Sequence, residues 1–236
     1  MDEYESIERA AKYYDSSISF DRYYIEYEAK LIAEYDKGPK VLEMGCASGV
    51  MTQFLVDIYP DVSVVDASIQ YFERIRSRFG TRVRAFHSLF EEFEPNENYN
   101  TIILARALEH VKDPVVILRH ASAWLVPGGK IHVIVPNAES LHRRVGKSMG
   151  IISELTDLTA QDKVVGHRRV YTAESLRKTV EQSGLSIVHE KGVYLKPFPN
   201  AQMEGWSREL INAFFELGKE LPNYCAEIYA ILSLDN

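Results

Sequence analysis

The chain has 236 residues, of which 46% are hydrophobic and 26% are charged, and this composition is that of an ordinary globular protein. The formal net charge of −7 argues against a protein that binds nucleic acid through its overall electrostatic field. The two cysteines lie far apart and neither belongs to a CxxC motif, so we expect no metal site and a reducing, cytoplasmic environment.

The N-terminal region is predicted to be helical. Tyr24, Tyr27, Leu31 and Tyr35 recur at helical spacing, and the pattern ends at Lys37–Pro39. The acidic first residues lack the features of a signal peptide, and no apolar run of the sequence is long enough to cross a bilayer. We therefore expect a helical extension or cap over residues 1–38 and no membrane partner.

Five apolar runs follow and alternate with helical patterns. The runs are Lys40–Met44, Val62–Asp66, Val83–Phe86, Thr101–Leu104 and Lys130–Val135. Runs that are apolar on both faces are typical of strands buried in a parallel sheet. The helix before the fifth run has a clear start, with Asp113 as N-cap and Pro114 at the first helical position. This alternation predicts a doubly wound α/β sheet.

The pattern changes after Val135. Residues 136–170 are polar and irregular, and residues 192–224 form a second insertion that contains a helical pattern. Leu185–Glu190 and Ala226–Leu232 have strand patterns, and Thr172 is the expected N-cap of the helix before the first of them. We expect seven strands in one domain over residues 39–236, with the two insertions as lids above a substrate.

A glycine loop follows the first predicted strand. From Glu43 to Gly49 the sequence reads E-M-G-C-A-S-G, an acidic residue followed by G-x-(G/A)-x-G. Small residues let the backbone turn sharply and approach a ligand closely, and alanine fits at position 47 if its φ is negative. The nicotinamide fingerprint G-x-G-x-x-G fits poorly, because Ala47 and Val50 occupy two of its glycine positions.

Asp66 closes the second predicted strand. A carboxylate at this strand end can accept hydrogen bonds from both hydroxyls of a ribose. Capping the next helix is the alternative role, and Ser68 offers a second side chain for that cap.

Four segments in order resemble the class I, S-adenosylmethionine (SAM)-dependent methyltransferases. E-M-G-C-A-S-G resembles their motif I, and residues 99–111 resemble F-D-x-V-x-x-x-x-x-L-E-H-V. L-V-P-G-G-K at 125–130 resembles L-x-P-G-G-x, and G-H-R-R-V-Y-T at 166–172 is similar to the late region of small-molecule members. The resemblance covers residues 41–190. It implies a Rossmann-like, mostly parallel sheet with an antiparallel last strand, SAM as methyl donor and S-adenosylhomocysteine as product.

The resemblance places the cofactor at the strand ends. The implied cofactor-binding residues are Glu43, Gly45, Cys46, Ala47, Gly49, Asp66, Ala67, Ser88, Leu89, Phe90 and Ala105. Ser88-Leu89 stands where many relatives carry G-D, so we expect backbone groups and the packing of Leu89 and Phe90 to hold adenine. Cys46 is expected to be a small loop residue and not a reactive thiol.

Basic side chains gather in the segments expected to meet the acceptor. The candidate substrate-binding residues are Arg106, Arg143, Arg144, Arg168 and Tyr171. Arginines in a net-acidic protein favour an anionic acceptor, with a carboxylate, a phosphate or an acidic sugar. The run from Arg143 to Lys147 also fits the solvated face of a helix. Residues 104–107 lack the Asn/Asp-Pro-Pro-aromatic turn of many nucleic-acid enzymes, so we expect no nucleic acid partner.

Methyl transfer from SAM depends mostly on positioning, because the sulfonium methyl group is already activated. A carboxylate acceptor needs no base, whereas a hydroxyl does, and His110 and His167 are the catalytic candidates. Packing is the alternative role of both histidines. We predict O-methylation of a carboxylate or hydroxyl on an anionic small molecule or modified peptide, as in natural-product biosynthesis.

Three other functions remain open. N-methylation of an amino sugar or amine would favour acidic or aromatic pocket residues over arginines. A SAM-binding protein without catalysis would keep the same fold. A nicotinamide oxidoreductase is disfavoured by Glu43 and Val50. No motif specifies an oligomeric state.

Overall fold

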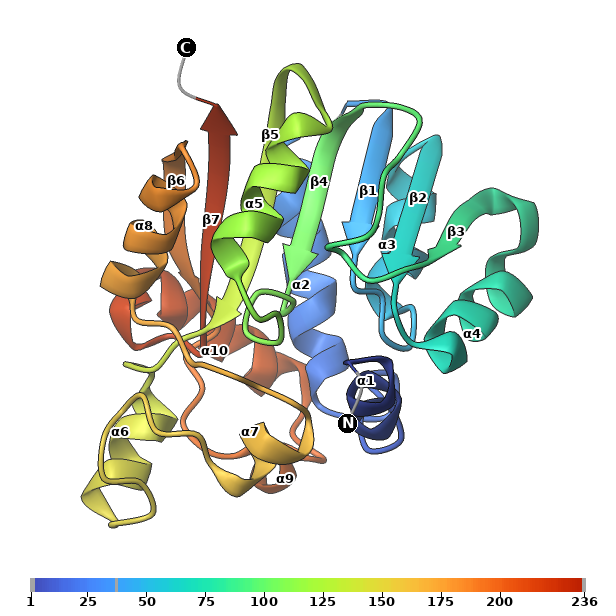
Figure 1. Cartoon of the computed structure of the whole chain (residues 1–236). Coiled ribbons are helices and arrows are strands. Elements are labelled where there is room, and N and C mark those ends of the chain that lie inside the picture. The colour runs from blue at the N-terminus through green and yellow to red at the C-terminus, as the bar shows by residue number, and fades with distance from the viewer. Residues whose placement is uncertain (1–2, 37, 235–236) are drawn as a thin grey trace.

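A twisted sheet of seven strands forms the centre of the molecule (Figure 1). The structure, a computed structural model, describes residues 3–36 and 38–234. The strand order is β3-β2-β1-β4-β5-β7-β6. The strands are β1 (Lys40–Met44), β2 (Asp61–Asp66), β3 (Val83–His87), β4 (Tyr99–Ala105), β5 (Leu125–Pro136), β6 (Leu185–Val193) and β7 (Glu227–Leu234).

The direction of the strands agrees with the sequence prediction. The four pairs that join β3, β2, β1, β4 and β5 are parallel, and β7 runs antiparallel to both β5 and β6. The mostly parallel sheet with an antiparallel last strand is therefore confirmed.

Helices cover both faces of this sheet. They are α1 (Glu3–Ala11), α2 (Asp21–Tyr35), α3 (Val50–Ile58), α4 (Ile69–Phe79), α5 (Pro114–Ala123), α6 (Leu141–Ser148), α7 (Ala160–Val164), α8 (Ala173–Gln182), α9 (Asn200–Met203) and α10 (Arg208–Glu220). One hydrophobic cluster joins α2, α3, α4 and α10 to one face, and a second joins α5 and α8 to the other. The predicted doubly wound architecture is confirmed.

The apolar strand runs are explained by burial on both faces. In β4, Ile102 and Leu104 pack into one cluster and Ile103 into the other, and all three side chains are fully buried. Successive side chains of a strand point to opposite faces, so a strand covered on both sides needs apolar residues at consecutive positions.

The helix starts that the sequence indicates are also present. The Asp113 carboxylate accepts hydrogen bonds from the amides of Val115 and Val116, at 3.0 and 3.2 Å. Thr172 accepts one from the amide of Ser175 at 3.0 Å. Both caps satisfy amides that the first helical turn leaves without a partner, so α5 and α8 begin where predicted.

The carboxyl ends of the parallel strands lie at the lower edge of the sheet in Figure 1. Helices α1, α6, α7 and α9 gather at this edge, and the N-terminal region forms two helices, α1 and α2. In the second insertion, α10 packs beside α2, where the ring of Phe215 stacks on Tyr27 with an interplanar angle of 8°. The first insertion and α1 therefore surround the edge at which this fold places ligands.

Candidate active site

The glycine loop after β1 has three residues with positive φ. Gly45, Ala47 and Gly49 have φ values of 88°, 44° and 76°. The condition that Ala47 needs a negative φ was wrong. The left-handed conformation of an L-residue costs roughly 1–2 kcal/mol, and hydrogen bonds hold it here. The amide of Gly49 donates to the Cys46 carbonyl at 2.8 Å, so this hydrogen bond closes a turn that contains Ala47.

Gly49 is required for packing as well as for conformation. A Cβ at this position would lie 2.7 Å from Cδ1 of Ile75 on α4. A Cβ at Gly45 would lie 3.5 Å from the ring of Phe90 and 3.7 Å from Cβ of Ala107. The loop is thus in close contact with α4 and with the segments after β3 and β4.

Asp66 connects the end of β2 to the glycine loop. One carboxylate oxygen accepts a hydrogen bond from the Cys46 amide at 2.9 Å, and the other accepts one from the Ser68 amide at 2.8 Å. Burial raises the pKa of Asp66, and these hydrogen bonds only partly oppose the shift. Ser68 caps α4 through a hydrogen bond from the Tyr71 amide at 3.3 Å. The capping role therefore belongs to Ser68, and Asp66 lies at the end of β2 beside the glycine loop.

Glu43 and Cys46 are both buried in this region. The Glu43 carboxyl accepts a hydrogen bond from the Thr52 hydroxyl at 2.6 Å, and burial raises its pKa to about 8. Burial also raises the pKa of the Cys46 thiol well above its usual value. An activated thiolate requires the opposite shift, so the geometry suits a small packing residue at position 46.

The other expected cofactor-binding residues surround the loop. The amide of Ser88 donates to the Asp66 carbonyl at 3.1 Å, and the Ala67 carbonyl lies 3.0 Å from Nε2 of His87. Leu89 follows Ser88, and Ala105 is the last residue of β4. These residues meet at the carboxyl edge although they come from three different strand ends.

The N-terminal segment lies across this part of the molecule. The hydroxyl of Tyr4 accepts a hydrogen bond from the Leu89 amide at 3.4 Å, and the hydroxyls of Ser16 and Ser48 are 2.6 Å apart. The Tyr71 hydroxyl donates to a backbone carbonyl of the same segment at 2.7 Å. Sequence reasoning missed Tyr4 and Ser16, because no motif surrounds them and their partners are remote in the chain.

Arg106 lies directly after β4, but its charge is neutralised within the protein. Its guanidinium pairs with the buried carboxylates of Glu28 and Glu227. Burial lowers the pKa of Arg106, but these two carboxylates raise it, and the result is well above the usual value. The residue has φ of 54°, so the chain turns sharply at this point.

The remaining arginines have different surroundings. Arg143 is buried and bonds the Leu155 carbonyl at 2.9 Å and the Asp162 carboxylate at 3.3 Å, so it holds the first insertion together. Arg168 pairs with Glu3 of α1 at 2.8 Å.

Like Arg168, Arg144 is exposed. It lies 3.7 Å from Glu139 and lines two surface depressions, one with Lys147 and the other with Tyr224. Tyr171 is buried, and its hydroxyl donates to the Leu108 carbonyl at 3.4 Å. The structure therefore does not gather the predicted arginines into one open cluster.

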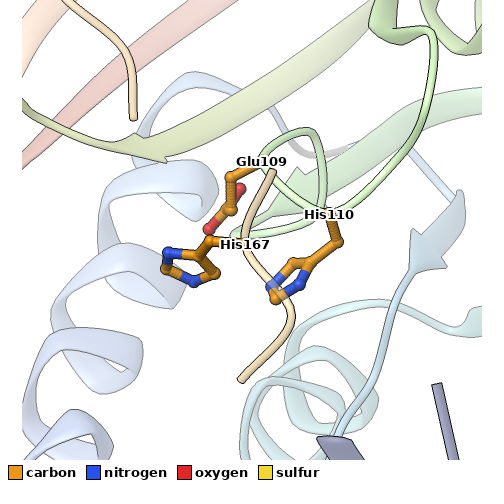
Figure 2. A group of neighbouring side chains, drawn as sticks. All are labelled: Glu109, His110 and His167. Atoms are coloured by element: carbon orange, nitrogen blue, oxygen red, sulfur yellow. The ribbon is translucent and has the colours of Figure 1, made fainter. Parts of the chain in front are cut away.

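The two predicted catalytic histidines do come together, and Glu109 joins them (Figure 2). The rings of His110 and His167 have centroids 4.8 Å apart and are nearly perpendicular. Nδ1 of His167 lies 3.2 Å from a carboxylate oxygen of Asp162. Glu109 was not among the predicted site residues, although it belongs to the same L-E-H-V segment as His110.

Burial determines the direction of the pKa shifts of Glu109 and His110, whereas neighbouring carboxylates determine that of His167. Burial raises the pKa of Glu109 to about 7 and lowers that of His110 to about 3, where the neighbouring His167 adds to the effect. Burial also lowers the pKa of His167, but Asp162 and Glu109 raise it, and the net shift is upward. Ala107, on the same turn, is the residue that faces Gly45, so this cluster lies next to the glycine loop.

Comparison with known proteins identifies relatives of this arrangement. A family described as a methyltransferase domain matches residues 18–190. An uncharacterised methyltransferase of Mycobacterium tuberculosis is 29% identical over 113 residues, which are 47% of this chain and 57% of that protein. The match thus spans little more than half of that relative's length. A ubiquinone biosynthesis O-methyltransferase of Aliivibrio fischeri is 28% identical over 176 residues, which are 71% of this chain and 73% of that protein.

A solved structure supports the same fold. The N-methyltransferase NodS of Bradyrhizobium japonicum, bound to S-adenosylhomocysteine, superposes with a TM-score of 0.63 at 17% identity, and the alignment covers 100% of both chains. Within residues 3–36 and 38–234, no helix has the length and apolar character needed to span a membrane.

Proposed function

This chain belongs to the methyltransferase-domain family of class I, SAM-dependent enzymes, and from that premise we propose that it methylates a hydroxyl oxygen of a small molecule or modified peptide. In this reaction the oxygen of the acceptor forms a bond to the methyl carbon while the bond from that carbon to the sulfonium sulfur breaks. The donor leaves as S-adenosylhomocysteine, and the hydroxyl proton must be removed.

The cluster of Glu109, His110 and His167 carries this proposal. It lies at the carboxyl end of β4, beside the glycine loop expected to hold SAM. Imidazole nitrogens and a carboxylate are the groups that accept a hydrogen bond from a hydroxyl and assist in removing its proton. A carboxylate acceptor would need no such group, so the cluster favours a hydroxyl.

The sequence relatives support the same choice. The relative from Aliivibrio fischeri, which matches most of this chain, is named for O-methylation. We propose that an anionic group of the acceptor lies near Arg144, because its guanidinium is exposed at the first insertion. Arg106, Arg143 and Arg168 form shorter ion pairs within the chain than the 3.7 Å contact of Arg144 with Glu139, so their proposed role is to hold the walls of the site.

N-methylation of an amine is the second candidate, and one observation favours it. The Glu109 carboxylate is fully buried, and a carboxylate beside the reaction centre can hold an ammonium group. NodS, which has the same fold, is named as an N-methyltransferase.

The test uses methyl-labelled SAM with three matched acceptors, which carry a phenol, a carboxylate or a primary amine on the same ring. Methyl esters release volatile label in mild base, whereas ethers and methylamines keep it. Methylamines bind a cation exchanger at acidic pH, and ethers do not. We expect a stable, uncharged labelled product. A labelled product retained on the exchanger would show that the acceptor is an amine and not a hydroxyl. SAM binding without any labelled product would indicate a non-catalytic protein.

A further inference from the structure

The side chains of Glu109, His110 and His167 converge from two segments that are remote in the chain (Figure 2). Glu109 and His110 lie on the turn after β4, and His167 follows α7 in the first insertion. One nitrogen or carboxylate oxygen of each residue lies within 4.8 Å of the corresponding atoms of the other two. Such a group can share one cation.

The buried carboxylate of Glu109 requires a positive partner. Its side chain is 0% exposed, and in the described part of the chain neither of its oxygens has a hydrogen-bond partner. A buried charge without a partner is strongly unfavourable. Arg106 pairs with Glu28 and Arg168 with Glu3, so the positive charge beside Glu109 comes from His167 or from an ion that both residues bind.

The two histidines are held as metal-binding histidines usually are. A metal-bound imidazole commonly gives its second ring nitrogen to a carboxylate or a backbone carbonyl, which fixes the orientation of the ring. Nδ1 of His167 lies at the ion-pair distance of 3.2 Å from a carboxylate oxygen of Asp162, although the hydrogen-bond geometry is not met, and we assign Nε2 to the ion. The Asp162 carboxylate is itself fixed by the amide and the hydroxyl of Thr159, both at 2.8 Å. His110 interacts with the backbone of Gly166.

We propose that Glu109, His110 and His167 bind one divalent transition-metal ion, with Zn²⁺ or Mn²⁺ as the fitting class. Two imidazoles and one carboxylate are a donor set of such ions, whereas Ca²⁺ and Mg²⁺ prefer sites built from oxygen alone. Bonds of about 2.0–2.2 Å place ligand atoms closer together than 4.8 Å, so the side chains close by roughly 1 Å around the ion. Three protein ligands leave coordination positions open for an acceptor.

The role of the ion rests on the proposed function, but its presence does not. Bound to the ion, the acceptor hydroxyl loses its proton to solvent more readily, because the positive charge stabilises the oxyanion. The oxyanion then attacks the methyl carbon of SAM, and S-adenosylhomocysteine departs.

Binding is tested with the full chain after chelator treatment and removal of the chelator. Co²⁺ is titrated while its visible absorption is followed, and Zn²⁺ binding is measured by calorimetry. The variants are Glu109→Gln, His167→Asn and Asp162→Asn, and the control is His120→Asn on α5, away from the cluster. We expect one ion per wild-type and control chain, at least tenfold weaker binding in Asp162→Asn, and a larger loss in the two ligand variants.

Two results would overturn the site: no ion bound by the wild type, or equal affinity in wild type, Glu109→Gln and His167→Asn. Thermal unfolding in the absence of metal shows which variants are folded, and only those are compared. Methyl transfer by the chelator-treated protein separates the two proposals. Methylation of the phenol with no ion bound would remove the proposed role of the ion in catalysis and leave the proposed function. Tight binding at the three residues with no methylated phenol would leave the metal and remove the proposed function.

Discussion

The two halves of the candidate active site are built in different ways. The donor half consists of the glycine loop and Asp66, which lie within one strand–helix–strand unit and are joined by hydrogen bonds from backbone amides of the loop to the Asp66 carboxylate. The acceptor half consists of side chains from the turn after β4 and from the first insertion. A backbone-built site is set by short-range sequence, whereas a side-chain-built site depends on the packing of remote segments. Mutations in the donor half should therefore weaken cofactor binding, and mutations in the acceptor half should lower turnover or acceptor binding, each without the other effect.

His110→Asn is expected to give the largest effect on turnover. We expect kcat to fall by about 10²–10⁴-fold, because the variant removes an imidazole from the group that assists loss of the hydroxyl proton. Affinity for S-adenosylhomocysteine should stay within about twofold of wild type, since the His110 ring packs against His167 of the acceptor half. Steady-state kinetics with the phenol acceptor and calorimetry with S-adenosylhomocysteine check this. If kcat and the affinity for S-adenosylhomocysteine both fell, the donor half and the acceptor half would not be independent.

Gly49→Ala tests the donor half. Its Cβ would lie 2.7 Å from Ile75 in a backbone with φ of 76°, so the loop or α4 has to move. Overpacking and a left-handed alanine together cost roughly 2–4 kcal/mol, and we expect affinity for S-adenosylhomocysteine to fall by about 100-fold. Gly184→Ala is the control: its φ of 78° is close to that of Gly49, but the described part of the chain has no atom within 4 Å of the added Cβ. Calorimetry and thermal unfolding distinguish them, and equal affinity losses would contradict the packing argument.

Asp66→Asn tests the connection between β2 and the loop. The neutral amide keeps the shape but replaces a charged acceptor, and hydrogen bonds to charged groups contribute about 1.5–3 kcal/mol. We expect affinity for S-adenosylhomocysteine to fall by about 10–30-fold, with turnover at saturating SAM nearly unchanged. Ser68→Ala is the control, because loss of the α4 cap should lower stability by about 1 kcal/mol without changing affinity. Unchanged affinity in Asp66→Asn would remove the ribose role.

Arg144→Ala should have the smallest effect, on the acceptor half. The guanidinium is exposed, so we expect KM for an anionic phenol to rise by about three- to fivefold while kcat and SAM affinity stay the same. The uncharged analogue of that phenol should show no change in KM. Arg76→Ala, an exposed arginine on α4, serves as the control. Equal KM values for wild type and Arg144→Ala would place the anion-binding group elsewhere.

The sequence by itself determined the sheet and the donor half. Strands buried on both faces require consecutive apolar residues, and caps such as Asp113 and Thr172 fix helix starts through local hydrogen bonds. The glycine loop was also visible, since its small residues are adjacent in the chain. The conformation of Ala47 was not, because neighbouring hydrogen bonds stabilise a φ that alanine alone disfavours.

Only the tertiary structure decided what the charged residues of the acceptor half do. In the sequence, Arg106 and Arg143 are indistinguishable from arginines that bind an anionic substrate. In the folded chain, Arg106 pairs with Glu28 and Glu227, and Arg143 pairs with Asp162. Glu109 was not predicted, because a single glutamate in a motif does not indicate a site. In the folded chain it is buried beside His167. The physical reason is range: a hydrophobic pattern acts over a few residues, whereas the partner of a buried charge is fixed only when remote segments pack together.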